Sequence, residues 1–349
     1  MTTQKALWLH KVGDEFVLGR NDIPEPGPGE VLVKNYSIAL NPLDSVVQRS
    51  GIQFLKNFPV ILGEEGSGVV QKVGEGVTNL AVGDKVFYHI NFTFEHKYSA
   101  FQEYTLIAAD VVGKMPDNLT FDQAASICAG ITPFATGTYV QEPHGCGFTA
   151  PFESEGGVGK HQGQPILIMA GAASLGQYAI QLAKLSGFSP IITTASLHNR
   201  DYLLSLGATH VLDRNLSPAA LKSEVARITT VPVTYAFDAV SVADTQQTAY
   251  DILAPGGKLV IGTPKTIKEA DGSGKKVVHT YGSFQVPHQR QLGVQFMREL
   301  TNWLAEGKIK PNIIEVLPGG LNAIAGGLKR IGSGAVSATK LVVHPSETA

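Results

Sequence analysis

Cysteine is scarce in this chain, and runs of one charge or of apolar residues are short. Of its 349 residues only two are cysteines, Cys128 and Cys146, which excludes a disulfide scaffold and a zinc lobe built on several cysteines. The net charge is −2 and no basic cluster is longer than Lys275-Lys276, which argues against binding to nucleic acid or to a membrane surface. No apolar run approaches the length of a membrane span, and the first residues show no leader pattern, so we expect a cytoplasmic protein.

The chain does contain enough apolar sequence for large cores. Hydrophobic residues make up 43% of the total, and the 38 glycines and 19 prolines are scattered, as in a turn-rich globular protein. A length of 349 residues predicts two domains, or one domain inserted into another.

One stretch, residues 164–176, has the strongest local pattern. An apolar run at 166–169 leads into the small residues Ala170-Gly171-Ala172-Ala173, and a helix with an apolar side begins at Ser174. Small residues let the backbone approach a ligand, and the helix start directs N–H groups and the positive end of its dipole at an anion. We interpret the turn as a site for a dinucleotide pyrophosphate, although Ala173 stands where a glycine would strengthen the pattern. The alternative is an ordinary strand–turn–helix without a ligand.

The sequence around this turn alternates between strand and helix patterns. We expect strands near residues 166–170, 191–195, 210–212, 234–237 and 258–262. We expect helices near residues 174–186, 200–206, 218–229 and 244–253. Near-continuous apolar strands separated by helices specify a parallel sheet with right-handed crossovers, which is the context that the dinucleotide motif requires.

The sequence pattern at both ends of the chain differs from the strand–helix alternation in the middle. Short strands broken by Gly and Pro turns predict a small barrel or sandwich near the N-terminus, with one helix near residues 41–49. Thr120, with Gln123 three residues later, has the form of a helix capping box. After a helix near residues 291–306, the C-terminal strands resemble the N-terminal block in style. We therefore expect a β-rich catalytic domain formed by residues 1–125 and 268–349, with a cofactor domain at 126–267 inserted in it.

The end of the second strand of the cofactor domain indicates which dinucleotide binds. An NAD site usually places Asp or Glu about 20 residues beyond the first glycine of the motif, where it binds the ribose hydroxyls. Here the strand is followed by Ser196, His198, Asn199 and Arg200, with no acid at its tip. These side chains suit a 2′-phosphate, which a carboxylate would repel, so we favour NADPH over NADH. Ser196 or Asn199 could instead cap the next helix, and both roles can coexist.

Several segments along the chain match the motifs of one superfamily; they are residues 24–33, 41–44, 62–74, 83–86, 170–176, 307–311 and 334–343. With them the chain resembles the medium-chain dehydrogenase/reductase superfamily over nearly its whole length. It is most similar to the zinc-free enoyl and quinone reductases, especially fungal enoyl reductases that act beside polyketide synthases. The resemblance implies an α/β protein in which a Rossmann cofactor domain is inserted in a GroES-like β-rich catalytic domain.

Two positions bear on whether a metal is needed. Zinc-dependent members of the superfamily carry a Cys ligand where this chain has Asn41, and a His ligand in a Gly-His-Glu motif that here reads Gly63-Glu64-Glu65. Because zinc prefers thiolate and imidazole ligands, we expect no metal. Alcohol oxidation is disfavoured without a Lewis acid, whereas a polarised C=C bond can accept hydride directly from NADPH.

The resemblance also implies roles for individual residues. The polar candidates for catalysis are Asn41, Thr132 and Tyr88, although Thr132 could cap a helix and Tyr88 could be a half-buried strand residue. Asp44 either contributes to the cofactor site or caps the helix that begins after Asn41. The remaining cofactor residues implied are Ala172, Ala173, Ser174, Leu175, Gly176, Ser196, His198, Asn199, Arg200, Arg214, Val240, Gly262, Thr263, Val336 and Ser337.

Two departures from related reductases concern the proton donor. Relatives often have Lys at the position of Val46, and some mitochondrial enoyl reductases have a Tyr proton donor near Gln53. This chain has neither, so the usual acid is missing, and a water molecule could supply the proton at the α-carbon.

These observations predict an NADPH-dependent reductase of the C=C bond in enones, enals or enoyl thioesters. The alternatives are an NADPH:quinone oxidoreductase and a non-catalytic NADPH-binding protein. We expect a small-molecule substrate and neither nucleic acid nor membrane as a partner. The choice between monomer and homodimer stays open, and the resemblance to reductases that act beside polyketide synthases raises a partner synthase as a further hypothesis.

Overall fold

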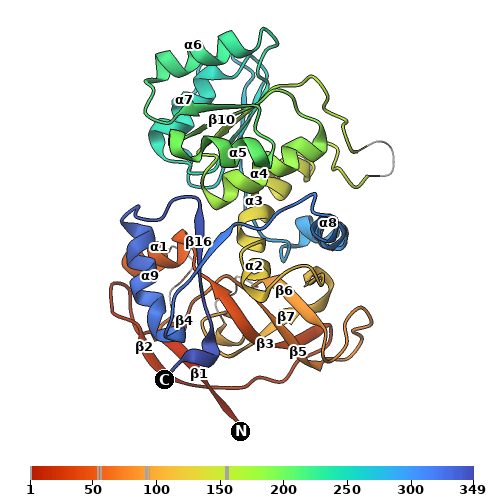
Figure 1. Cartoon of the computed structure of the whole chain (residues 1–349), viewed down its shortest axis with the longest axis vertical. Helices are drawn as coiled ribbons and strands as arrows, with labels where there is room; N and C mark the ends of the chain where they lie inside the picture. The colour runs from red at the N-terminus through yellow and green to blue at the C-terminus, as the bar shows by residue number, and fades with distance from the viewer. Residues whose placement is uncertain (1, 53–54, 56, 91–92, 94, 154–156) are drawn as a thin grey trace. The chain divides into compact units, whose positions relative to one another are not determined.

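The computed structural model describes residues 2–52, 55, 57–90, 93, 95–153 and 157–349, and Figure 1 traces the chain from red to blue. By their internal contacts these residues form two compact units. Unit 1 contains Met1–Ala129, Met297–Ala305 and Pro311–Ala349, and unit 2 contains Gly130–Phe296 and Glu306–Lys310.

Unit 2 is built on a six-stranded parallel sheet with the strand order β11-β10-β9-β12-β13-β14. The strands are β9 (Ile166–Met169), β10 (Ile191–Ala195), β11 (His210–Asp213), β12 (Tyr235–Asp238), β13 (Lys258–Ile261) and β14 (Lys276–His279). The central strands β9, β10 and β12 are buried along their whole length, as expected for a parallel sheet covered on both faces. The predicted parallel sheet is therefore confirmed.

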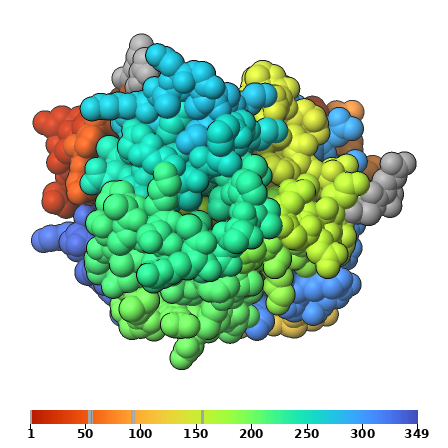
Figure 2. Space-filling view, turned by 90° about the horizontal axis from the view of Figure 1, so that it is seen from above, coloured from red at the N-terminus to blue at the C-terminus, as the bar shows by residue number. Residues whose placement is uncertain are grey.

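The helices of unit 2 begin and end at local signals in the sequence. They are α4 (Ser174–Ser186), α5 (Arg200–Leu206), α6 (Pro218–Ile228) and α7 (Ala243–Ile252), within one or two residues of the predicted bounds. Helix α6 starts with Pro218 after Ser217, whose Oγ accepts the N–H of Ala220 at 3.3 Å. Helix α4 ends at Gly187 with φ 87°, a conformation that favours glycine. In Figure 2 the green and cyan part of the chain, which contains α5 to α7, forms the middle of the face shown.

One core cluster shows how α6 and α7 cover the sheet. Apolar side chains of these helices pack against alternate residues of the central strands, and the cluster includes Leu167, Ile192, Leu221, Val225, Ala236, Tyr250 and Leu259. Burial of such side chains stabilises each by about 1.5–3 kcal/mol relative to exposure, which holds the strands and their carboxyl ends in fixed register.

The chain leaves the middle of this sheet in two directions. From β9 at the centre the chain runs outward to β10 and β11. It then returns to β12, on the other side of β9, and runs outward in the opposite direction to β13 and β14. This reversal lies between β9 and β12, and in open parallel sheets ligands bind at such a point, outside the carboxyl ends of the strands.

The sheet extends beyond the expected boundary of the cofactor domain. Residue 267 was the expected end, but β14 pairs in parallel with β13 from Lys258↔Lys276 to Ile261↔His279, so the return to the β-rich part comes later. The polar loop between the two strands hid this continuation, because it lacks the helix that usually joins parallel strands. Helix α3 (Cys128–Tyr139) and helix α8 (Pro287–Ala305) each contain a border between the two units.

Unit 1 joins both ends of the chain in one mixed sheet, as the sequence predicts, and also contains a smaller antiparallel sheet. A seven-stranded sheet contains β3 (Glu30–Ala39), β5 (Glu65–Val73), β6 (Lys85–His89), β7 (Tyr104–Ala108), β8 (Gly113–Lys114), β15 (Ile313–Val316) and β16 (Thr339–Val343). A three-stranded sheet contains β1 (Thr3–Leu9), β2 (Val17–Asp22) and β4 (Val60–Ile61). The C-terminal strand β16 pairs antiparallel with β3 through Val342↔Ala39 and Val343↔Ile38.

Short helices complete unit 1: α1 (Pro42–Ser50), α2 (Phe121–Ala125) and α9 (Ile324–Gly332). The predicted capping box at α2 is confirmed, because Thr120 Oγ1 accepts the N–H of Gln123 at 3.2 Å and Gln123 Oε1 accepts that of Thr120 at 3.0 Å. Among the described residues, no helix combines the length and the apolar character needed to cross a membrane.

Candidate active site

The turn between β9 and α4 requires glycine at two positions. A Cβ added to Gly171 would lie 2.2 Å from Thr193 Oγ1, and one added to Gly176 would lie 2.3 Å from the carbonyl oxygen of Ala170. Ala170 itself has φ 58°, in the left-handed region, so the chain reverses sharply here. The small residues therefore serve first to bring the helix start against the strand end.

The N-terminus of α4 offers backbone N–H groups at the carboxyl edge of the sheet. The first turn of any helix leaves N–H groups without intrahelical acceptors, and the cap residue Ala173 has no polar side chain to accept one. Gln177 Nε2 donates to the carbonyl of Ala172 at 2.9 Å and fixes the turn. Of the predicted pyrophosphate residues, Ala172 and Ala173 lie in this turn, and residues 174–176 form the first turn of α4.

The next strand, β10, ends in a polar tip. Ser196 precedes a short 3-10 helix, Leu197–Asn199; His198 and Arg200 are exposed, whereas Asn199 is buried. As far as the described atoms show, neither Ser196 nor Asn199 caps the following helix with its side chain. The tip thus presents polar groups that local helix capping does not use.

Arg214 joins this tip from the neighbouring strand β11. Its backbone N–H donates to the carbonyl of Ala195 at 3.0 Å, which places it beside the end of β10. Asp213, the nearest carboxylate on β11, accepts the N–H of Asn215 at 2.9 Å and so closes its own turn. The predicted group of Ser196, His198, Asn199, Arg200 and Arg214 is brought together by the sheet.

On the other side of β9, the ends of β12 and β13 are tied together through Asp238 and Ser241. Asp238 Oδ1 accepts the N–H groups of Val240 at 3.1 Å and Ser241 at 2.8 Å. Ser241 Oγ accepts the N–H of Gly262 at 2.9 Å, and the Thr263 hydroxyl donates to the Ser241 carbonyl. The predicted residues Val240, Gly262 and Thr263 therefore share one edge with the turn after β9.

Asp238 and Ser241 were not among the predicted site residues, although their hydrogen bonds connect the ends of β12 and β13. Thr245 Oγ1 donates to the second carboxyl oxygen of Asp238 at 2.6 Å. Burial raises the pKa of Asp238, while these hydrogen bonds lower it in part. The available signal was an Asp directly after a buried strand, a position from which side chains often close turns.

Three predicted residues lie elsewhere. Thr132, in α3 of unit 2, donates through Oγ1 to the carbonyl of Gly282 at 2.9 Å, so its hydroxyl proton has a backbone acceptor. Val336 and Ser337 belong to unit 1, just before β16, and Thr339 Oγ1 donates to the Ser337 carbonyl at 3.1 Å. Gln53, near which the resemblance implies a Tyr in some mitochondrial enoyl reductases, lies outside the described residues.

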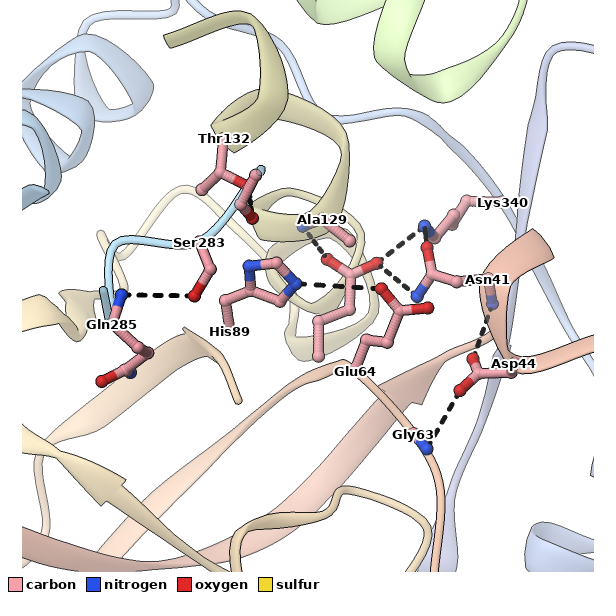
Figure 3. Close-up of polar contacts among 12 residues, drawn as sticks. Asn41, Asp44, Gly63, Glu64, His89, Ala129, Thr132, Ser283, Gln285 and Lys340 are labelled. Carbon is pink, nitrogen blue, oxygen red and sulfur yellow. Dashed lines mark hydrogen bonds and ion pairs between the residues drawn. The ribbon is translucent and has the colours of Figure 1, made fainter. Parts of the chain in front are cut away.

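Within unit 1, Asn41, Glu65 and Lys340 form a buried hydrogen-bonded cluster. Figure 3 labels Asn41 and Lys340 of this cluster. Asn41 Nδ2 donates to Glu65 Oε1 at 3.1 Å, and Lys340 Nζ donates to Asn41 Oδ1 at 2.5 Å. The second oxygen of Glu65 accepts the N–H of Ala129 at 2.8 Å. Both ends of the Asn41 amide are thus used inside the cluster, which favours a positioning role for this catalytic candidate.

Asp44 completes the start of α1. Its Oδ2 accepts the N–H of Asn41 at 3.1 Å and its Oδ1 accepts the N–H of Gly63 at 3.0 Å. The capping role is therefore confirmed, and the bonding of both oxygens favours it over the predicted contribution to the cofactor site. Burial, followed by the charge of Glu64, raises the pKa of Asp44 well above its usual range.

The third catalytic candidate, Tyr88, is wholly buried in the core of unit 1. Its hydroxyl donates to Asn35 Oδ1 at 2.5 Å, and Asn35 in turn donates to Thr105 Oγ1 at 2.9 Å. Burial raises the pKa of Tyr88, which makes it a weaker acid. This arrangement favours the strand-core role over the catalytic one.

Two polar residues beside the cluster, Glu64 and His89, were not among the predicted site residues. Figure 3 shows their side chains directed toward each other, with Glu64 Oε2 at 3.9 Å from His89 Nε2. The signal in the sequence is the doubled acid Glu64-Glu65, in which an acid stands where the zinc motif has His.

The donor set around Asn41 does not suit zinc. Lys340 places an ammonium group 2.5 Å from the Asn41 amide oxygen, and a nearby cation opposes the binding of another. The described residues include no group of three or more His, Cys, Asp or Glu side chains arranged to hold a metal ion.

Comparison with known proteins now assigns the family. Residues 174–286 match the family model for zinc-binding dehydrogenases, and residues 27–117 match that for the alcohol dehydrogenase GroES-like domain. The chain is 30% identical to a trans-enoyl reductase of a Penicillium species, with 98% of each chain covered. It belongs to the medium-chain dehydrogenase/reductase superfamily, in the enoyl reductase branch. The predicted Rossmann and GroES-like folds are confirmed.

Two further relatives agree with this assignment. A trans-enoyl reductase of Talaromyces wortmannii is 30% identical, with 95% of each chain covered. The solved structure of a quinone oxidoreductase from Coxiella burnetii matches with a TM-score of 0.74 and 25% identity, covering 98% of this chain and 99% of that one.

Proposed function

We propose that this protein is an NADPH-dependent reductase of the C=C bond of α,β-unsaturated carbonyl compounds. The observation that carries the proposal is the glycine-dependent turn at the switch point of the parallel sheet, next to a strand tip without a carboxylate. The full-length similarity to proteins named trans-enoyl reductases supports the reaction class.

The residues at the carboxyl edge of the sheet fit a phosphorylated dinucleotide. The turn at 172–176 would hold the pyrophosphate through backbone N–H groups, where the helix dipole also favours an anion. Ser196, His198, Arg200 and Arg214 would hold the 2′-phosphate through hydroxyl, imidazole and guanidinium groups. When bound, NADPH supplies a hydride to the β-carbon of the unsaturated substrate.

The experiment is a turnover assay with purified protein. NADPH and NADH are each offered with a 2-alkenal, an enone and an enoyl thioester, while cofactor oxidation and the saturated product are followed together. We expect one saturated product for each NADPH oxidised, and much weaker turnover with NADH. Failure to oxidise NADPH with any of these alkenes would overturn the proposal.

The same assay distinguishes two alternative functions from the proposed one. The similarity to the Coxiella burnetii quinone oxidoreductase motivates the first, and higher turnover of a simple quinone than of the alkenes would favour it. A protein that binds NADPH in calorimetry but turns over neither class would instead be a non-catalytic binding protein.

A further inference from the structure

Two neighbouring helices of unit 2 follow the two parts of the dinucleotide site. The turn at residues 170–173, which we call the pyrophosphate turn, leads into α4. The polar residues 196–200, which we call the 2′-phosphate tip, lead into α5, whose first residue is Arg200. Helices α4 and α5 contact each other (Figure 1). A ligand that spans the turn and the tip therefore depends on how these two helices are held together.

Gln177, a buried residue in the first turn of α4, fixes the pyrophosphate turn. Its Nε2 donates to the carbonyl oxygen of Ala172 at 2.9 Å. The N–H of the same peptide group, that of Ala173, donates to the carbonyl of Ala170 at 3.0 Å. This peptide group is therefore held at both ends, and it sets the direction of the N–H groups that follow it at the helix start.

The other end of the same amide reaches α5. Gln177 Oε1 accepts the hydroxyl of Tyr202 at 2.8 Å, and Tyr202 lies two residues after Arg200 in the first turn of α5. At its end α5 again approaches α4, because a Cβ added to Gly207 would lie 2.6 Å from Lys184 Cδ. One buried amide thus connects the pyrophosphate turn to the helix that continues the 2′-phosphate tip. We call its two hydrogen bonds the Gln177 bridge.

A second glutamine on α4 holds a different part of the chain. Gln181 is also buried, and its amide bonds both backbone groups of Lys310, with Nε2 donating to the carbonyl at 3.1 Å and Oε1 accepting the N–H at 2.7 Å. It connects α4 to a segment outside the turn and the tip. Gln181 therefore has the same residue type, helix and burial as Gln177 without the link between the two parts of the site.

We propose that the Gln177 bridge sets the spacing between the pyrophosphate turn and the 2′-phosphate tip, which makes Gln177 and Tyr202 positioning residues for NADPH. This inference rests on the function proposed above. NADPH carries a phosphate group for each part, so its second contact forms within the complex once the first is made. A spacing fixed in advance lowers the cost of ordering both contacts. NADH lacks the 2′-phosphate and 2′-AMP lacks the pyrophosphate, so neither depends on that spacing.

The first test is Tyr202→Phe, which removes one hydroxyl and keeps the ring. Calorimetric titration should show the Kd for NADPH rising about tenfold, while the Kd values for NADH and 2′-AMP change by less than about twofold. Tyr139→Phe is the matched control, because it removes a Tyr hydroxyl that is 2.7 Å from Ser186 Oγ at the opposite end of α4. It should bind all three ligands as the wild type does.

Three outcomes of this test would overturn the proposal. The first is an unchanged Kd for NADPH in Tyr202→Phe. The second is an equal change for all three ligands, which a general loosening of α5 would produce. The third is the same loss of NADPH affinity in the control Tyr139→Phe, which would show that any lost contact of α4 has this effect.

The second test removes the whole bridge with Gln177→Met. Because the turn also loses its support, the Kd values for NADPH and NADH should both rise about tenfold or more, while that for 2′-AMP stays unchanged. In this background Tyr202→Phe should add less than about twofold, since the hydroxyl has already lost its acceptor. Gln181→Met, four residues later on the same helix, is the control and should bind as the wild type does. Independent, additive effects of the two substitutions would contradict a shared bridge.

These titrations also separate this inference from the function on which it rests. A wild type that binds NADPH no more tightly than NADH, and does not bind 2′-AMP, would overturn the proposed cofactor and the spacing role with it. A wild type that prefers NADPH, together with a Tyr202→Phe variant that keeps the full preference, would overturn the role of the bridge alone.

Discussion

Lys340 Nζ lies 2.7 Å from Glu65 Oε1, and the two side chains are 5% and 0% exposed. Lys340 comes from the C-terminal strand β16 and Glu65 from β5, with β3 between them in the sheet. This buried ion pair therefore joins the two ends of the chain within unit 1, and Asn41 supports it from the start of α1.

Removal of the cation should destabilise unit 1 strongly. Lys340→Met leaves the Glu65 carboxylate buried without its charge partner, which costs roughly 3–5 kcal/mol. The double variant Lys340→Met with Glu65→Gln should regain part of this loss, because no buried charge then remains unpaired. Urea unfolding measures both, with the exposed pair Lys72–Glu25 as control: Lys72→Met should change stability by less than about 0.5 kcal/mol. Equal effects of the two Lys substitutions would contradict this account.

The turn after β9 should tolerate no added methyl group. Gly176→Ala places a Cβ 2.3 Å from the Ala170 carbonyl oxygen, so the helix start must shift away from the strand end. We expect the Kd for NADPH to rise about tenfold or more, since a shift of this kind costs about 1–3 kcal/mol. Fluorescence titration with NADPH measures it. Gly326→Ala, in α9 with nothing within 4 Å of the added Cβ, is the matched control and should bind as the wild type does.

A carboxylate at the tip of β10 should reverse the choice of cofactor. In Ser196→Asp a negative charge would face the 2′-phosphate, and the Kd for NADPH should rise about tenfold or more, while that for NADH should not. Ser205→Asp, an exposed position on α5, introduces the same charge away from the tip and serves as control. If both variants weaken NADPH binding equally, the added charge acts generally and Ser196 does not contact the 2′-phosphate.

Tyr88→Phe should affect stability more than turnover. The variant leaves the buried Asn35 Oδ1 without the hydroxyl that now bonds to it, a loss of about 1–3 kcal/mol. The exposed Tyr36, whose ring stacks on Phe121, provides the control Tyr36→Phe, which should change stability by less than about 0.5 kcal/mol. Chemical unfolding and kcat are measured together. A large fall in kcat at unchanged stability would restore Tyr88 as a catalytic residue.

His89 should weaken the fold at acid pH. Its pKa is lowered to about 4 by burial, and Lys340 adds to this while Glu65 opposes it. The unfolded chain therefore binds a proton between pH 6.5 and 4 that the folded chain does not, and stability falls as pH falls through this window. In His89→Gln the loss of stability at acid pH should be smaller than in the wild type. Unfolding midpoints of both proteins at pH 4.5 and 7.5 measure this loss. If the midpoint changes equally in both proteins between the two pH values, the account is contradicted.

The sequence determined the architecture of unit 2 closely, because its signals are local. The apolar strands, Ser217-Pro218 at the start of α6 and Gly187 at the end of α4 each act over a few residues, and α4 and α6 lie within one residue of their predicted ranges. The polar tip at Ser196 was equally readable, since the strand pattern fixes which residues follow the sheet edge. The motifs of both domains further identified the superfamily.

Only the tertiary structure decided what the acids and the catalytic candidates contact. Glu64 and Glu65 are adjacent in sequence and equal in type, yet Glu65 is paired with Lys340 from the other end of the chain, while Glu64 Oε1 accepts no hydrogen bond from the described residues. Long-range packing sets burial and hydrogen bonding, and these set a pKa. For the same reason the sequence could indicate where a dinucleotide binds through the turn at 170–176, but could not show that burial raises the pKa of Glu64.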